Sequence, residues 1–468
     1  MRVRLKFLSL SRKTMSITPL DAISPIDGRY RKVSEPLSGY FSESALIRYR
    51  VRVEAAYLLA LAETGLPGPS SLSSEAKAAL QRMASNEGEI NAARVKEIES
   101  TTNHDVKAVE YYMKEQLGDL LGGASEFIHF GLTSQDINNT AIPMLLRDAL
   151  QHVMAPALDE VLHKLCAAAE SWRDIAMLSR THGQPASPTT LGKEFAVFCE
   201  RIIQQKKLLQ TIPWSAKFGG ATGNFNAHHA AYPEHDWAAF GNRFIQSLGL
   251  HRSTITTQIE HYDNMAAVYD NWRRINTILI DLCRDVWTYV SLGYFTQTVK
   301  KGEVGSSAMP HKVNPIDFEN AEGNLGMANS VFQFLSEKLP VSRLQRDLTD
   351  STVLRNAGVP FAHTLIALRS LSKGLDKIQV NPQALANDLE ANWAVVSEAV
   401  QTILRREGYP QPYEALKELT RNGGDSITRE TMHAFINGLA VTDAVKRELL
   451  AITPVNYTGN ASRFIIPS

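Results

Sequence analysis

The chain has few cysteines, and their number and spacing argue against a disulfide-stabilised fold. Its 468 residues include three cysteines, Cys166, Cys199 and Cys283, which are odd in number and far apart. Small secreted domains that depend on disulfides carry denser, even-numbered sets of cysteines. We therefore expect a reducing, cytoplasmic compartment. A chain of this length can bury a sizeable core without such cross-links.

The chain also lacks an excess of charge of either sign. Lys and Arg number 49, and Asp and Glu number 49, so the formal net charge is zero. A neutral chain has no general attraction to a polyanion, which argues against a nucleic-acid coat protein and a polybasic membrane binder. Any anionic ligand has to be held by a local cluster of cations.

Long apolar runs are missing as well. No run approaches the roughly 20 residues that a membrane helix needs, so we expect neither membrane nor nucleic acid as a partner. Residues 1–14 begin like a basic targeting segment, but Lys6 and Ser9 interrupt their apolar part and no small-residue cleavage site follows. Because a second methionine stands at position 15, we interpret residues 1–14 as a disordered upstream extension.

Helical periodicity dominates what is present. Apolar residues recur every three or four positions over residues 265–290 and the pattern ends at Gly293, which predicts one long helix. Ser187-Pro188 predicts the start of a second, with serine as N-cap and proline in the first turn. Two more long helices are expected, from about Met144 to Trp172 with a kink at Pro156, and from Leu325 to Pro340.

Strand patterns are scarce, and Ser253–Ile259 is the one short candidate. Four long helices in the middle of the chain predict an all-α fold with an elongated bundle, and stripes of that length favour burial against other subunits. The flanking parts show shorter helical segments. We therefore predict an N-terminal helical domain over residues 15–123, a central long-helix bundle over 124–375 and a C-terminal helical domain over 376–468.

The segment 305–315, with the sequence GSSAMPHKVNP, concentrates polar groups in a loop. The segment contains two hydroxyls, a lysine and an asparagine amide. Such groups can stabilise a carboxylate whose negative charge grows during a reaction. On composition alone, the segment could equally be a loop in which Asn314 caps a helix and Pro315 begins it.

This segment resembles the signature of the fumarase/aspartase superfamily, Gly-Ser-Ser-x-Met-Pro-x-Lys-x-Asn-Pro, at every fixed position. The resemblance implies an all-helical homotetramer that eliminates fumarate, or a close relative of it, from a succinyl adduct. It also implies active sites that draw on three subunits at the ends of a twenty-helix central core.

Two further segments match the superfamily. His182, in residues 181–185, matches a catalytic acid, and Thr133 and Ser134, in residues 128–136, match positions that bind the succinyl carboxylates. From the residues alone, His182 could be a structural histidine. Thr133 could simply cap a helix, with a carboxylate three residues later that completes the cap.

Outside these segments the chain resembles the adenylosuccinate lyase family from Met15 to the C-terminus, notably at residues 24–30, 101–107, 257–260 and 342–355. Arginine with serine suits a phosphate monoester, although the arginines could also form a solvated helix face paired with Asp347 and Asp350. The implied substrate-binding residues are Arg29, Tyr30, Asn103, His104, Asp105, His129, Thr133, Ser134, Gln258, Asn314, Arg346, Ser351 and Arg355.

The family resemblance implies a lyase of purine biosynthesis that eliminates fumarate from adenylosuccinate to give AMP, and from the succinyl-carboxamide ribotide (SAICAR) to give AICAR. No cofactor is expected. The implied catalytic residues are Ser306 as the base that removes the β-proton, His182 as the acid that protonates the leaving nitrogen, Lys312 as a stabilising cation, and Glu319, which orients the histidine.

Three other interpretations bear on this one. The glycine-rich stretch 218–228 lacks the Lys-Ser/Thr ending of a phosphate loop, and His228, His229 and His235 lack a metal-site spacing, so we predict no metal.

A 3-carboxymuconate cycloisomerase-like or argininosuccinate lyase-like enzyme shares the loop skeleton, and a catalytically silent structural relative is a further class. The intact polar residues of the two superfamily segments favour an enzyme.

Overall fold

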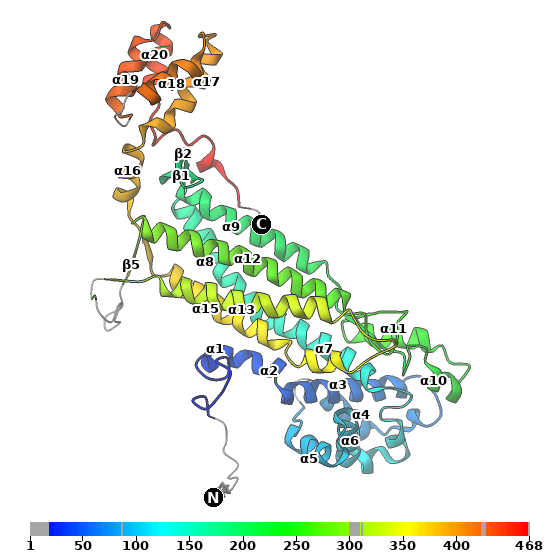
Figure 1. Cartoon of the computed structure of the whole chain (residues 1–468). Helices are drawn as coiled ribbons and strands as arrows, with labels where there is room; N and C mark the ends of the chain where they lie inside the picture. Colours follow the sequence, from blue (N-terminus) through cyan, green and yellow to red (C-terminus); the bar gives the residue numbers. More distant parts are fainter. Residues whose placement is uncertain (1–17, 86–87, 299–308, 310–311, 423–426, 467–468) are drawn as a thin grey trace, which may run out of the picture.

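The computed structural model describes residues 18–85, 88–298, 309, 312–422 and 427–466. Residues 1–14, predicted as a disordered extension, lie outside the described residues, and so does Ser306. The described elements form three groups along an elongated molecule (Figure 1). Helices predominate and the strands form three two-stranded sheets within the described part of the chain, which confirms the all-α class.

The N-terminal group packs around the helix α3, which faces two cores. Val53 and Tyr57 of α3 belong to the main core of the molecule, whereas Val51 and Leu58 belong to a second core with the helices that follow. Ser42 caps α3 by accepting a hydrogen bond from the Ala45 N–H. The elements are α1 (Arg31–Ser34), η1 (Glu35–Leu37), α2 (Ser38–Phe41), α3 (Glu43–Ala62), η2 (Pro69–Ser71), α4 (Ser74–Ala84), α5 (Ala92–Thr102), α6 (Asp105–Leu121) and η3 (Gly122–Phe127).

The central group is a bundle of long helices, as the periodicity predicted. Its longest member, α12, packs its apolar stripe inward, and Trp272 meets Phe361 with ring centroids 5.9 Å apart. The Phe332 ring packs edge-on against the Phe361 ring, with centroids 4.9 Å apart. The bundle consists of α7 (Ser134–Ala149), η4 (Leu150–Met154), α8 (Ala155–Ser171), α9 (Leu191–Gln210), α12 (Asp263–Ser291), α13 (Ile316–Lys338) and α15 (Gly358–Leu375).

The predicted helix start at Ser187 is wrong. Residues Gln184–Thr190 form strand β2, which pairs antiparallel with β1 (Ala176–Thr181), and α9 begins only after its N-cap Thr190. The register shifts between Met177 and Ser179, so Pro188 lies at an irregularity of the ladder, where a missing N–H is tolerated. Hairpin pairing with the preceding strand thus overrides the Ser-Pro signal.

The long helix predicted with a kink at Pro156 runs through α7, the π-helical turn η4 and α8, and η4 ends two residues before Pro156. Proline has no N–H to donate to the preceding turn, so an irregularity at this point agrees with the prediction. Another local prediction is wrong. The strand predicted at Ser253–Ile259 is absent. Only His251–Arg252 pairs as β4, with β3 (Ser215–Ala216), and Ser253 then turns its hydroxyl toward Glu260.

The C-terminal group has a separate core around Trp393 and Met432. It follows a short sheet in which β5 (Phe295–Gln297) pairs with β6 (Ile378–Val380). The group comprises α16 (Pro382–Glu390), η5 (Trp393–Val396), α17 (Ser397–Arg406), α18 (Pro412–Asn422), α19 (Arg429–Gly438), α20 (Asp443–Leu450) and η6 (Ala461–Arg463). The remaining helices, α10 (Asn226–Ala231), α11 (Trp237–Ser247) and α14 (Thr349–Leu354), lie in connections beside the bundle.

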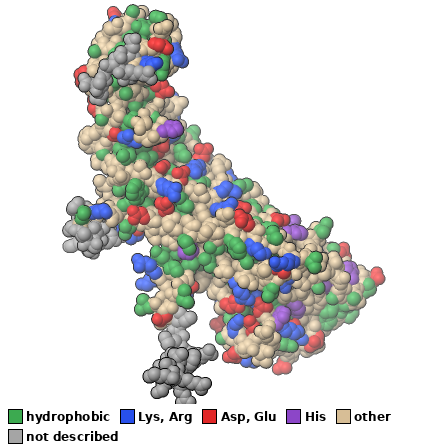
Figure 2. All heavy atoms as spheres, in the orientation of Figure 1, with side chains coloured by type: hydrophobic (Ala, Val, Ile, Leu, Met, Phe, Trp, Pro, Cys, Tyr) green, Lys and Arg blue, Asp and Glu red, His purple; other side chains and the backbone are tan. Residues whose placement is uncertain are grey.

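The surface agrees with the balanced composition. Acidic and basic side chains are interspersed over the visible face (Figure 2). None of the described helices is long and apolar enough to span a membrane.

Candidate functional site

An open cavity of about 330 Å³ lies where the starts of α6 and α7 meet α14. Because these elements come from distant parts of the chain, the tertiary fold brings together residues that the sequence separates by up to 256 positions, from Glu99 to Arg355. Seven of the predicted substrate-binding residues line the cavity: Asn103, His104, Asp105, Ser134, Arg346, Ser351 and Arg355.

The turn between α5 and α6 presents the first three of them. Asn103 ends α5 in the left-handed conformation, with a φ of +50°, and His104 is the N-cap of α6. The Nδ1 atom of His104 accepts a hydrogen bond of 3.1 Å from the Lys107 N–H. A neutral ring that accepts at Nδ1 carries its proton on Nε2, which leaves a donor for a ligand.

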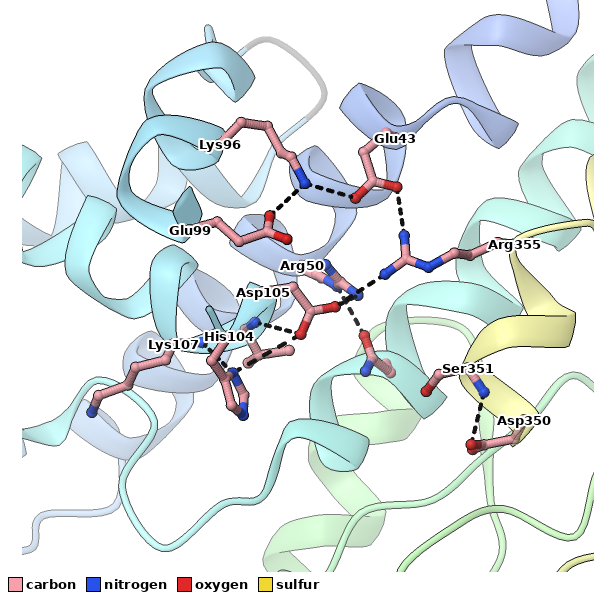
Figure 3. A network of polar contacts seen from close by, with 12 residues as sticks. Glu43, Arg50, Lys96, Glu99, His104, Asp105, Lys107, Asp350, Ser351 and Arg355 are labelled. Carbon is pink, nitrogen blue, oxygen red and sulfur yellow. Dashed lines mark hydrogen bonds and ion pairs between the residues drawn. The ribbon is translucent and has the colours of Figure 1, made fainter. Parts of the chain in front are cut away.

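Asp105 stands between two arginines (Figure 3). Its Oδ2 lies 2.6 Å from the buried Arg50 and 3.5 Å from Arg355, and Arg355 also meets Glu43 at 2.7 Å. Burial opposes ionisation of Asp105, but Arg50, the Val106 N–H and Arg355 outweigh it and lower the pKa of this carboxyl. Asp105 therefore stays charged and fixes the Arg355 guanidinium at the cavity.

Arg346 gathers three polar partners on the other side of the cavity. Its guanidinium lies 2.9 Å from the Ser351 hydroxyl and 3.4 Å from both Gln258 and Asp350. The Arg346 side chain is only 17% exposed, which does not fit a solvated helix face. Arg343 fits that description instead, because it is 77% exposed and pairs with Asp347.

The N-terminus of α7 brings Thr133 and Ser134 to the site. Thr133 caps the helix, and its own N–H donates to Asp136 Oδ2 at 2.8 Å, so the capping box considered from the sequence is present. Asp136 Oδ1 also accepts from the Lys217 ammonium at 2.7 Å and from the Gly219 N–H at 2.8 Å. This fully buried ion pair joins the glycine-rich stretch to the helix start. His129 precedes that start and bonds to Glu54.

Four residues of this site were missed by sequence reasoning: Arg50, Glu54, Asn138 and Lys217. Asn138 lines the cavity and accepts a hydrogen bond of 2.8 Å from Arg50. One signal was available in the sequence, since polar residues cluster at Gln135, Asp136, Asn138 and Asn139 of α7, and the structure buries all four. Lys217 and Glu54 carried no such signal, because their partners lie far away in sequence.

A second group of predicted residues lies at the start of α13. Asn314 is half-buried and precedes the N-cap Pro315, so it is not itself the cap. Lys312 is exposed, and Glu319, in the first turn of α13, accepts a hydrogen bond of 3.1 Å from the Trp287 indole. These groups face away from the bundle core.

Arg29 and Tyr30 join this second group. The Tyr30 hydroxyl donates to Asn320 of α13 at 3.0 Å. The Arg29 guanidinium carbon lies 5.9 Å from the centre of the Tyr30 ring, and its side chain is exposed. The start of α1 therefore sits against the first turns of α13.

His182 is alone at a third place. It stands at the tip of the β1–β2 hairpin with a φ of +54° and is exposed. Arg180, two residues earlier, donates to both oxygens of Asp388 on α16 at 2.7 and 2.8 Å, which holds the hairpin against the C-terminal group. In Figure 1 the hairpin and helices α5 and α6 lie toward opposite ends of the bundle. One chain thus keeps the predicted site residues in three separate groups.

Among the residues that the structure describes, no group of three or more His, Cys, Asp or Glu side chains could hold a metal ion. The three cysteines are free thiols.

Comparison with known proteins extends these observations. Residues 28–331 match the family model described as "Lyase", and residues 342–458 match the one described as "Adenylosuccinate lyase C-terminal". The chain is 54% identical over 455 residues to an adenylosuccinate lyase of Dictyostelium discoideum, covering 95% of this chain and 98% of the relative. It is 48% identical to an adenylosuccinate lyase of Escherichia coli K12, covering 96% and 98%.

Solved structures with the same fold are more distant in sequence. A fumarate lyase from Mesorhizobium sp. BNC1 aligns with a TM-score of 0.71 at 20% identity, covering 92% of this chain and 96% of that one. A 3-carboxy-cis,cis-muconate lactonizing enzyme from Pseudomonas putida aligns with a TM-score of 0.70 at 22% identity, covering 91% and 94%. At these identities the likeness shows the fold alone.

Proposed function

This chain belongs to the adenylosuccinate lyase family, and we propose from that premise that it eliminates fumarate from adenylosuccinate to give AMP. It is a lyase, and by the same chemistry it would convert SAICAR to AICAR. The observation that carries the proposal is the cavity in which Arg346, Ser351 and Arg355 converge, in a chain 54% identical to a named adenylosuccinate lyase. Guanidinium groups with a hydroxyl suit the phosphate of a nucleotide.

We propose that the working enzyme is a homotetramer. Its three groups of site residues would then meet only where copies of the chain adjoin. Large apolar side chains that a single chain leaves exposed on α12 and α13 support this assembly, because exposed apolar stripes mark association surfaces. They include Trp287 at 47%, Met327 at 55% and Phe334 at 54% exposure.

The binding roles follow from the groups. Arg346, Ser351 and Arg355 would hold the phosphate, with Arg29 and Tyr30 supplied from another copy. The α7 N-terminus, with Thr133 and Ser134, would bind a succinyl carboxylate, because the unpaired N–H groups of a helix start favour an anion. The remaining proposed binding residues are Asn103, His104, Asp105, His129, Gln258 and Asn314.

The proposed reaction is a β-elimination. Ser306, outside the described residues, would remove a proton from the carbon next to a carboxylate, and Lys312 with Asn314 would stabilise the charge that develops there. The electron pair of the C–H bond forms the C=C bond of fumarate, and that of the C–N bond departs with the nitrogen. His182 would protonate that nitrogen, and Glu319 would orient the histidine.

Two further assignments accompany this function. We propose domains over residues 15–123, 124–375 and 376–468, in keeping with three groups of elements that have cores of their own. We also propose a cytoplasmic location, which the three free cysteines support.

The deciding experiment is incubation of the purified chain with adenylosuccinate. Fumarate and AMP should form in equal amounts, and argininosuccinate and malate should give no fumarate. Release of fumarate from argininosuccinate or malate instead would overturn the assignment.

A further inference from the structure

A carboxylate in the middle of α3 is buried without a Lys or Arg partner among the described residues. The Glu54 side chain has no exposed surface. Its Oε1 lies 2.6 Å from His129 Nδ1, while its Oε2 is buried and has no hydrogen-bond partner in the described part of the chain. Burying a charge in this way is costly unless it is paired. The pairing with His129 therefore explains how a carboxylate is tolerated at this buried position.

His129 is held in an unusual backbone conformation ahead of the α7 helix start. Its φ is +61°, a region that non-glycine residues adopt only where the surroundings enforce it. Its carbonyl accepts from the Leu132 N–H at 3.2 Å, in a turn that leads into Thr133 and Ser134. The imidazole is 18% exposed, so its ring is not sealed off from a ligand.

The carboxylates that act on His129 come from three helices. Glu54 lies on α3, Glu110 on α6 and Asp136 on α7. The other two carboxylates already have cations of their own: Glu110 meets Lys107 at 2.8 Å, and Asp136 meets Lys217 at 2.7 Å. Among the described residues, His129 is the one hydrogen-bonding partner of Glu54. The charge of Glu54 therefore acts mainly on the imidazole.

We propose that Glu54 is a positioning residue that holds His129 as an imidazolium and turns its Nε2–H toward an anionic group of the substrate. The inference rests on the proposed function. It adds the His129 imidazolium to the arginines and lysines that are proposed to bind the anionic groups of the substrate. A carboxylate bonded to one ring nitrogen of a histidine fixes the ring orientation and leaves the other nitrogen as donor.

A second buried histidine shows what the carboxylate changes. His228 is fully buried and its Nε2 meets the neutral Tyr57 hydroxyl at 3.0 Å, and burial lowers the pKa of His228 to about 4. Burial acts on His129 in the same sense, but the charge and hydrogen bond of Glu54, with help from Glu110 and Asp136, raise its pKa above 6.5. The pKa values of the two histidines therefore shift in opposite directions because His129 is hydrogen-bonded to a carboxylate and His228 to a neutral hydroxyl.

The test compares the wild-type enzyme with Glu54→Gln, which keeps the size of the side chain and removes its charge. The pKa of His129 should drop below 6.5, because desolvation then prevails. At a pH just above 6.5, the KM for adenylosuccinate should rise roughly tenfold, as expected for loss of one charge-assisted hydrogen bond, while kcat changes less. Superimposable KM–pH profiles for the two proteins would overturn the proposal.

A direct readout is the titration of His129 by NMR in histidine-labelled full-length protein, assigned with the His129→Gln variant. Wild-type His129 should titrate above 6.5, and a value below 6.5 overturns the inference even if Glu54→Gln fails to fold. Glu110→Gln is the matched control, since it removes a nearby charge without a hydrogen bond to His129, and it should shift His129 less than Glu54→Gln does. An equal shift would overturn the special role of Glu54.

The two proposals fail in different ways. If adenylosuccinate is not the substrate, the wild-type protein shows no turnover, and the NMR titration still tests the Glu54–His129 pair. If Glu54 has only a structural role, the wild-type protein turns over adenylosuccinate and Glu54→Gln changes its stability without shifting the KM–pH profile.

Discussion

The ammonium of Lys217 lies 2.7 Å from the Asp136 carboxylate, and neither side chain has any exposed surface. Asp136 also accepts hydrogen bonds from the backbone N–H groups of Thr133, Gly219 and Gly220. One buried carboxylate thus ties the start of α7 to the glycine-rich stretch, and the cation beside it is what makes its burial tolerable.

Lys217→Met should destabilise the protein strongly. The substitution leaves Asp136 buried without its cation, which costs about 3–5 kcal/mol in comparable buried pairs. Thermal unfolding at fixed protein concentration measures the loss. As a control, Arg406→Met breaks the exposed pair with Glu448 and should leave the melting temperature nearly unchanged. Equal melting temperatures for the two variants would contradict the stabilising role of Lys217.

Arg346→Ala should weaken substrate binding more than it slows turnover. The guanidinium is proposed to hold the phosphate before and during the reaction, so its loss should raise the KM for adenylosuccinate by about tenfold or more with a smaller change in kcat. The exposed neighbour Arg343 supplies the control variant Arg343→Ala, which should leave both constants unchanged. An unaltered KM in Arg346→Ala would make this arginine structural.

His182→Ala should abolish most of the turnover and leave the fold intact. The side chain is exposed at the tip of a hairpin, so its removal disturbs no packing, whereas loss of a general acid lowers kcat by about 10²–10⁴-fold. Near-normal kcat at unchanged thermal stability would exclude His182 as the acid.

Mixed tetramers test whether copies share a site. His182→Ala and Lys312→Ala are each expected to be inactive alone, since both residues are proposed for every site. Subunit exchange between the two variants should restore activity, because some sites then receive His182 from one copy and Lys312 from another. Mixtures that form hybrid tetramers and stay inactive would show that both residues come from the same copy.

Asp285 on α12 should make the protein less stable as the pH rises. Burial and the neighbouring Asp281 and Glu194 raise its pKa to about 6. The folded state therefore binds this proton more tightly than the unfolded state, and the associated stability is present below pH ~4 and lost as the pH rises through about 6. Asp285→Asn should raise stability at pH 7 by about 1 kcal/mol, reduced from the full shift by partial solvent exposure. The free energy of unfolding is measured for both proteins by denaturation from pH 4 to 8. A difference between Asp285→Asn and wild type that stays constant over this range would contradict the prediction.

Local sequence was sufficient for the long helices and for the family. Periodic apolar residues predict α12 and α13 because a helix is stabilised along its own length and one face must be buried. The segments 101–107 and 342–355 identified six of the residues that line the cavity, because each motif is short and contiguous. The all-α class followed from the same local patterns.

Tertiary structure alone decided how those residues are distributed. The hairpin that carries His182 replaces a predicted helix start, because its strands are stabilised by each other and not by the residues within either one. The partners of Lys217 and Glu54 lie 81 and 75 positions away, and a charge in a sequence says nothing about which distant charge will meet it. The sequence by itself therefore determined most of the long helices, the family and the site residues that lie in short motifs. The fold decided which of those groups meet in one chain, because burial and ion pairing depend on contacts across the whole molecule.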